Sequence, residues 1–187
     1  MPTLWDVRAK LYDVIEASDL RRGACKSGLF SRMAGRVLFV GLGTGKDIHH
    51  FPPGIEIVAM DISDEMLRRC RSRQKTYPGV LRLVRADALS LCFCDESFDT
   101  VVTSCAMCSV DDPVLALREI HRVLRPAGKL LMFEHVRSKN PILGAVLDLM
   151  TLATRGGGTE MNRDTLSNVV RAGFRIVQVD RGSSILS

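Results

Sequence analysis

Long hydrophobic runs, aromatic residues and secretory features are scarce in this sequence. No apolar stretch approaches the roughly 18 to 20 uncharged residues of a membrane-spanning helix, and the first residues lack the basic and then apolar pattern of a signal peptide. Aromatic residues make up 5% of the 187 residues, which leaves few side chains for stacking on nucleic-acid bases. We therefore expect a cytoplasmic protein that neither spans a membrane nor binds nucleic acid.

Disulfides are not needed to stabilise a chain of this length. A domain of this size buries roughly 70% of the surface that its unfolded chain exposes, so residues 1–187 can form one domain with its own core. In a reducing cytoplasm the six cysteines should be thiols. Two close pairs, Cys92 with Cys94 and Cys105 with Cys108, suggest zinc. They flank a predicted strand, however, which places them near opposite sheet edges, and we predict buried thiols and no metal.

The charge balance allows attraction to anionic partners without choosing among them. The net charge is +5 and the isoelectric point is about 9.1. This excess of positive charge leaves open a peripheral contact with an anionic membrane or an acidic substrate.

Short apolar runs alternate with helical patterns along the chain. Helices are expected at 64–75, where Ser63 is a candidate N-cap, and at 113–124, where Asp111 or Asp112 is the candidate. The strand candidates are 36–40, 55–60, 81–84, 98–102, 129–133 and 174–179. This alternation predicts an α/β fold with a doubly wound, mainly parallel sheet and helices on both faces. Ligands of such sheets bind beyond the carboxyl ends of the strands.

The regions before and after the predicted core have apolar patterns of their own. Residues 1–15 place apolar side chains on one helical face and predict an amphipathic helix that lies across a core or a site. Residues 141–152 are apolar nearly all round, which suits either a helix packed over the core or a wall for a lipophilic ligand. We divide the domain into an N-terminal cap (1–30), a core (31–136), and a last part (137–187) with a lid helix, a final helix and the sixth strand.

Three glycines stand at alternate positions directly after the first predicted strand. Gly41, Gly43 and Gly45 allow the backbone to turn sharply and approach a ligand, because no β-carbon intervenes. A dinucleotide fingerprint needs a further glycine where this chain has Lys46. The spacing therefore argues against a pyrophosphate cofactor.

Two acidic residues follow the next two predicted strands. Asp61 can accept hydrogen bonds from both hydroxyls of a ribose, or it can be the acidic start of the following helix. Asp87, which precedes Ala88, can accept from an adenine amino group, or it can be a turn residue.

Five stretches together resemble the class I S-adenosylmethionine (SAM)-dependent methyltransferases: residues 37–45, 58–67, 86–88, 97–102 and 117–130. The chain is most similar to the methyltransferase type 11 branch, which includes ubiquinone/menaquinone, phosphatidylethanolamine and alkyl-thiol methyltransferases. The resemblance implies a Rossmann-like sheet, SAM as cofactor and S-adenosylhomocysteine (SAH) as product.

The same resemblance implies a role for individual residues. The glycine loop would cradle the methionine part of SAM. The residues from Asp61 onward would contact the ribose and the adenine, and the residues after the fourth strand would lie near the sulfonium. The expected cofactor-binding residues are Gly41, Leu42, Gly43, Gly45, Asp61, Ile62, Met66, Asp87, Ala88, Ser104 and Cys105.

Two residues are candidates for the catalytic step. Tyr12 matches the place where an N-terminal helix covers the cofactor in similar enzymes. His135 follows the fifth strand and could accept a proton near neutral pH. Alternatively, Glu134 and His135 form a structural pair that fixes a loop.

Two features depart from the family pattern. Phe39 stands two residues before Gly41, where the family carries a carboxylate that helps to hold the ammonium group of the cofactor. Only residues 181–187 follow the presumed sixth strand, although the family inserts a seventh strand between its fifth and sixth. We predict a missing or vestigial seventh strand and an exposed sheet edge that could pair with another chain.

The predicted function is transfer of a methyl group from SAM to a small, lipophilic acceptor such as a phospholipid amine, a quinone precursor or a thiol. The alternative is a SAM-binding module with little or no catalysis, which Phe39 and the short C-terminus favour. A nicotinamide-dependent dehydrogenase is a distant third, because its glycine spacing differs. The sequence does not indicate the oligomeric state.

Overall fold

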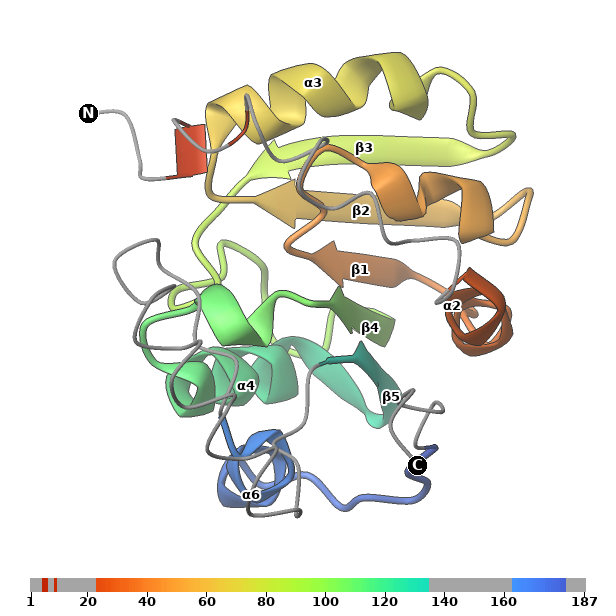
Figure 1. Cartoon of the computed structure of the whole chain (residues 1–187). Helices are drawn as coiled ribbons and strands as arrows, with labels where there is room; N and C mark the ends of the chain where they lie inside the picture. Colours follow the sequence, from red (N-terminus) through yellow and green to blue (C-terminus); the bar gives the residue numbers. More distant parts are fainter. Residues whose placement is uncertain (1–4, 7–8, 10–22, 135–162, 181–187) are drawn as a thin grey trace, which may run out of the picture.

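The protein folds around one parallel sheet. The computed structural model describes residues 5–6, 9, 23–134 and 163–180. Its five strands pair in the order β3-β2-β1-β4-β5, and every pairing is parallel (Figure 1). They are β1 (Val37–Val40), β2 (Glu56–Asp61), β3 (Val80–Arg85), β4 (Phe98–Ser104) and β5 (Leu124–Phe133). This arrangement confirms the predicted doubly wound α/β fold.

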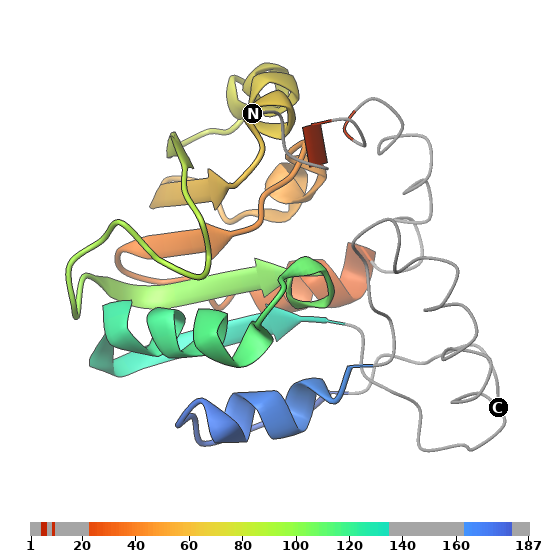
Figure 2. The same cartoon turned by 90° about the vertical axis from the view of Figure 1, so that its left-hand side faces the viewer.

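Helices cover both faces of this sheet. Figure 2 shows α6 beside α4, and these two helices also contact each other directly. The helices are α2 (Gly23–Phe30), α3 (Asp64–Gln74), α4 (Pro113–Val123) and α6 (Thr165–Arg171), with 3-10 turns η2 (Lys46–His50) and η3 (Met107–Ser109).

The central strand β1 belongs to both layers of the core. Leu38 and Val40 pack on the face covered by α4 and α6, whereas Val37 and Phe39 pack on the face covered by α2, η2 and α3. All four side chains are at most 1% exposed. Burial on both faces explains why this strand reads as a continuous apolar run rather than an alternating one.

The predicted helix starts are confirmed by their hydrogen bonds. The Ser63 hydroxyl accepts from the Met66 N–H at the start of α3, and the Asp112 carboxylate accepts from the Val114 and Leu115 N–H groups at the start of α4. Both contacts satisfy amides that a helix leaves without an internal partner.

The predicted sixth strand does not form. Residues 174–180 follow α6 but are neither helix nor strand. Val177 is 86% exposed and Val179 is 45% exposed. Among the described residues β5 pairs only with β4, so residues 174–180 do not extend the sheet beyond β5.

The prediction of buried thiols is wrong for one cysteine pair. None of the six cysteines is in a disulfide, but Cys92 and Cys94 are exposed, whereas Cys108 is buried. Cys92 and Cys94 alternate with Leu91 and Phe93 in the connection before β4. Leu91 and Phe93 take the inward positions, and the Phe93 ring packs edge-on against Phe98 at 5.2 Å between centroids.

Several predictions fall on residues outside the described part of the chain. They concern most of the N-terminal helix with Tyr12, the candidate base His135, the apolar stretch 141–152 and the C-terminal residues 181–187. Within the described ranges, no helix is long and apolar enough to cross a membrane.

Candidate active site

The glycine loop turns away from the sheet at the carboxyl end of β1. Gly41, Gly43 and Gly45 all have positive φ, at 75°, 59° and 80°. The N–H groups of Gly41 and Leu42 donate to the Met60 carbonyl at 2.9 and 3.0 Å, which ties the loop to the end of β2. Residues with a β-carbon rarely adopt this backbone conformation, so the alternating glycines are what allow this loop.

Two of these glycines also touch their neighbours closely. A β-carbon on Gly41 would lie 2.6 Å from the Ala106 β-carbon, and one on Gly45 would lie 2.5 Å from the Cys70 sulfur. The loop therefore packs against the segment after β4 on one side and against α3 on the other.

We expect Gly45→Ala to destabilise the fold far more than Gly54→Ala. Gly54 is the matched control, because its φ is 77° but nothing lies within 4 Å of the position of its β-carbon. Gly54→Ala should lower the free energy of unfolding by about 1 kcal/mol, because it strains the backbone. Gly45→Ala should lower it by about 3 kcal/mol, because the new methyl group also overpacks the contact with Cys70. Urea unfolding measures both values. Equal losses would show that the contact with Cys70 does not constrain the loop.

Asp61, the last residue of β2, connects the glycine loop to α3. Its Oδ2 accepts from the Gly43 N–H at 2.8 Å and its Oδ1 from the Ser63 N–H at 3.0 Å. Burial raises the pKa of Asp61, hydrogen bonds from the backbone of Ser63, Gly43 and Ile62 oppose that rise, and the nearby charge of Asp6 adds to it. Each carboxylate oxygen can accept more than one hydrogen bond, so Asp61 keeps acceptor capacity for a ligand.

The residues after Asp61 differ in their exposure. Ile62 is 37% exposed, whereas Met66, in the first turn of α3, is 2% exposed. An aliphatic side chain left open beside a carboxylate suits contact with the flat face of a base. Met66 is already packed.

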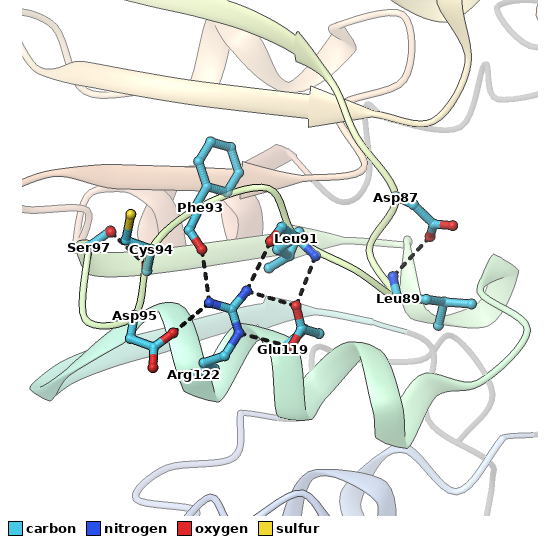
Figure 3. Close-up of polar contacts among 9 residues, drawn as sticks. All are labelled: Asp87, Leu89, Leu91, Phe93, Cys94, Asp95, Ser97, Glu119 and Arg122. Carbon is cyan, nitrogen blue, oxygen red and sulfur yellow. Dashed lines mark hydrogen bonds and ion pairs between the residues drawn. The ribbon is translucent and has the colours of Figure 1, made fainter.

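Asp87 lies in the connection after β3, which Arg122 of α4 holds in place (Figure 3). The Asp87 carboxylate accepts from the Leu89 N–H at 2.9 Å, and Ala88 beside it is 9% exposed. The Arg122 guanidinium donates to the carbonyls of Leu91 and Phe93, at 2.9 and 2.8 Å.

Arg122 also binds two carboxylates. It donates to Glu119 at 2.8 and 2.9 Å and to Asp95 at 2.7 Å, and Glu119 in turn accepts from the Leu91 N–H. Its partners raise the pKa of Arg122, with Glu119 the strongest influence, and hold the pKa of Glu119 below its usual range.

We expect Arg122→Lys to lower the free energy of unfolding by about 2 kcal/mol, because an ammonium group cannot reach four separate acceptors in one plane. Arg118→Lys is the control, since Arg118 lies exposed on the same helix. Urea unfolding of both variants tests this expectation. It fails if the two variants are equally stable.

The segment after β4 forms the wall opposite Asp61. The Ser104 hydroxyl is buried and has no hydrogen-bond partner among the described residues, whereas the Thr103 hydroxyl beside it interacts with the Glu134 carboxylate. Cys105 has a positive φ of 51°, and its N–H donates to the Phe133 carbonyl at 2.7 Å. A buried hydroxyl without a partner is costly, which indicates that a polar ligand group belongs here.

Glu134 and Arg163 hold this wall from its two ends. The Glu134 carboxylate accepts from the Ala106 and Met107 N–H groups at 3.1 and 3.2 Å. The Arg163 guanidinium donates to the carbonyls of Met107 and Val110. Burial raises the pKa of Glu134 to about 7, although hydrogen bonds from the Thr103 side chain and from the two amides lower it. Glu134 therefore fixes the turn after β4. The interpretation of Glu134 and His135 as a structural pair stays a prediction, because His135 lies outside the described residues.

Phe39 faces away from this wall. Its side chain is 1% exposed and packs against Phe30 and Phe51, with ring centroids 5.8 and 5.1 Å apart. A buried carboxylate nevertheless lies just past the glycine loop: Asp47 accepts from the Lys26 ammonium at 2.6 Å. The position of the family's acidic residue is thus part of an aromatic core in this chain.

The structure brings most of the predicted cofactor residues to one sheet edge. The loop of Gly41 to Gly45 contacts Asp61 and Ala106 directly, and Asp61 also accepts, through its carbonyl, from the Ala86 N–H just before Asp87. Sequence reasoning missed Asp6 and Arg163, whose contacts are remote in sequence. Among the described residues, no group of three histidine, cysteine or acidic side chains could hold a metal ion.

Comparison with known proteins identifies the class of this fold and site. The sequence matches the Methyltransferase domain family over residues 38–132. Over 123 residues it is 38% identical to the ubiquinone/menaquinone biosynthesis C-methyltransferase UbiE of Ectopseudomonas mendocina. The aligned region covers 63% of this chain and 48% of that protein. It is 32% identical over 141 residues to a phosphatidylethanolamine N-methyltransferase of Cereibacter sphaeroides, and this alignment covers 74% of this chain and 68% of that protein.

A more distant relative and a solved structure are also methyltransferases. The thiol S-methyltransferase TMT1B of Rattus norvegicus is 27% identical, with 77% of this chain and 62% of that protein covered. The crystal structure of a SAM-dependent methyltransferase from Thermotoga maritima has the same fold, with a TM-score of 0.72 at 21% sequence identity. The superposition covers 93% of this chain and 82% of that protein. The chain belongs to the SAM-dependent methyltransferases, in the Methyltransferase domain family. It spans about half the length of the UbiE proteins that it matches.

Proposed function

We propose that the chain binds SAM at the carboxyl edge of its sheet and transfers the methyl group to a small, lipophilic acceptor. The observation that carries the proposal is the position of the positive-φ glycine loop, in which Gly43 donates to Asp61 and Gly41 packs against Ala106 after β4. The family uses SAM as its methyl donor, and the described residues have the chemistry to hold it.

Each part of the site has a counterpart in the cofactor. Asp61 would accept hydrogen bonds from the ribose hydroxyls, Ile62 would contact the adenine, and the glycine loop would lie against the methionine part. The unpartnered hydroxyl of Ser104 would then find a polar group. Asp87 and Ala88, held through Arg122, would meet the adenine edge.

SAM supplies a methyl group that is already activated by its positive sulfur. The protein therefore has to align the acceptor and exclude water, and to remove a proton where the acceptor carries one. No metal is required for this. Tyr12 and His135 remain our candidates for the catalytic step.

The proposal of a lipophilic acceptor is supported by the relatives and by the composition of the chain. The named relatives act in quinone biosynthesis, on phosphatidylethanolamine and on thiols. The apolar stretch at 141–152 would suit the same kind of acceptor. The positive net charge would favour a peripheral contact with an anionic membrane that presents a lipid acceptor.

A second candidate is a SAM-binding module with little catalysis. Phe39 favours it, because a buried aromatic residue replaces the carboxylate that helps to hold the cofactor's ammonium group in the family. A loss of one charge-assisted hydrogen bond weakens binding roughly tenfold to a hundredfold. The ion-paired Asp47 is the nearest buried carboxylate in sequence beyond the loop.

Incubation of the full chain with SAM and one acceptor of each kind tests the two candidates. The acceptors are a phosphatidylethanolamine vesicle, a soluble quinol and an alkyl thiol, and mass spectrometry detects SAH and the methylated acceptor. Formation of both products with one acceptor supports the enzyme. Binding of SAM without SAH formation in any reaction would favour the module.

A further inference from the structure

We propose that Asp6 is a positioning residue for the cofactor site, acting through Ser63 on Asp61. This inference rests on the proposed function, since it concerns the carboxylate that would bind the ribose. Figure 1 shows residues 5–6 as a short red segment beside the first turn of α3. The contact joins two parts of the chain that are 57 positions apart.

Asp6 binds two donors at the start of α3. Its Oδ1 accepts from the Ser63 hydroxyl at 2.5 Å and from the Glu65 N–H at 3.1 Å. The Glu65 N–H lies in the first turn, where a helix has no carbonyl of its own to offer. Asp6 therefore provides a second cap for α3, from a distant part of the chain.

Ser63 passes this contact on to the cofactor site. It is 0% exposed, its hydroxyl oxygen accepts from the Met66 N–H at 3.1 Å, and its own N–H donates to Asp61 Oδ1 at 3.0 Å. Asp61 Oδ2 in turn accepts from the Gly43 N–H at 2.8 Å. A continuous series of hydrogen bonds thus runs from Asp6 to the glycine loop.

Each member of this series fixes the orientation of the next. Because the Ser63 hydroxyl gives its proton to Asp6, its lone pair is directed to the Met66 N–H, and the backbone from Asp61 to Glu65 is held at both ends. An Asp61 carboxylate that is fixed in advance loses less freedom when it binds hydroxyl groups. Loss of Asp6 should therefore weaken cofactor binding without removing any group that touches the cofactor.

The chain contains a natural reporter of this contact. Trp5, next to Asp6, is half-buried and is the single tryptophan of the sequence. Its fluorescence reports on the surroundings of Asp6 without a label. Linkage requires that a ligand whose binding is favoured by this contact also strengthens the contact, so SAH should change the emission of Trp5.

Titration of SAH into four forms of the full chain tests the proposal, with calorimetry and Trp5 fluorescence as the two readouts. The forms are wild type, Asp6→Ala, Asp6→Asn and the control Asp64→Asn. Asp64 is an exposed acid in the same helix turn that pairs with Arg85 and not with Ser63. Asp6→Ala should weaken SAH binding about tenfold and abolish the change in Trp5 emission. Asp6→Asn, which keeps an acceptor oxygen, should stay within about threefold of wild type, and Asp64→Asn should equal it.

The outcomes separate this proposal from the one on which it rests. If wild type does not bind SAH, the proposed function fails. If wild type binds and Asp6→Ala binds within twofold of it, only the role of Asp6 is refuted. The role is also refuted if Asp6→Asn loses as much affinity as Asp6→Ala, because the contact would then not act through an acceptor oxygen. Thermal unfolding of each variant verifies that it is folded.

Discussion

Replacement of Asp61 by alanine should weaken SAH binding at least about 100-fold, the largest effect on affinity that we expect from one substitution. Two losses combine. In the proposed binding mode the ribose hydroxyls would lose their acceptor, and the N–H groups of Gly43 and Ser63 lose theirs, so Gly43 is no longer held by the side chain of Asp61. Calorimetric titration of the folded variant measures the effect.

Asp61→Asn separates these two losses. An asparagine keeps one acceptor oxygen for the Gly43 or the Ser63 N–H but accepts fewer hydrogen bonds from a ligand. We expect it to be intermediate in both affinity and stability, because its NH2 group replaces the acceptor of one of these two N–H groups. Affinity of Asp61→Ala within threefold of wild type would mean that the ribose is bound elsewhere.

The second large effect concerns Glu134 and pH. The pKa of this carboxyl is raised from 4.5 to about 7, with burial as the main cause. Between these two values the folded protein binds more protons than the unfolded chain. The contribution of Glu134 to stability is therefore fully present below pH 4.5 and is lost as pH rises towards 7. The loss amounts to about 3 kcal/mol at most.

Urea unfolding at pH 5 and pH 7.5 tests this prediction. The free energy of unfolding of wild type should fall more steeply with pH than that of Glu134→Gln, which cannot ionise. Glu56→Gln is the control, because it makes the same substitution at a half-exposed side chain. Parallel pH profiles for wild type and Glu134→Gln would show that Glu134 is not buried as the structure has it.

The strands and helix starts could be predicted because their signals are local. A strand that is buried on both faces, such as β1, must be apolar throughout, and a helix start such as Ser63 needs an acceptor side chain. The position of the site follows from the same pattern, since the residues after parallel strands meet at one edge of the sheet. Gly41, Asp61 and Asp87 were found in this way.

The rest depends on contacts between distant parts of the chain. Residues 174–179 have the composition of a strand, but a strand also needs a neighbour with which to pair, and composition does not provide one. Cys92 and Cys94 are exposed because Leu91 and Phe93 take the inward positions, a choice of register that a run of apolar residues does not reveal. The contact of Asp6 with Ser63 joins residues 57 positions apart, and no local pattern predicts it.

The structure also explains why residue 39 is a phenylalanine. As a departure from the family pattern it indicated weak cofactor binding. In the structure it belongs to an aromatic cluster with Phe30 and Phe51, so this face of β1 contributes to the core. Whether the site binds its cofactor without an acid at this position is the central question about this chain.

Isothermal titration of SAH into the wild-type chain tests that question most directly. The account predicts binding of one SAH per chain with a dissociation constant of about 1 to 100 μM, which corresponds to roughly 5.5 to 8 kcal/mol. The absence of binding heat with SAH at about 1 mM would contradict it. The glycine loop and Asp61 would then be the remains of a site that no longer holds the cofactor.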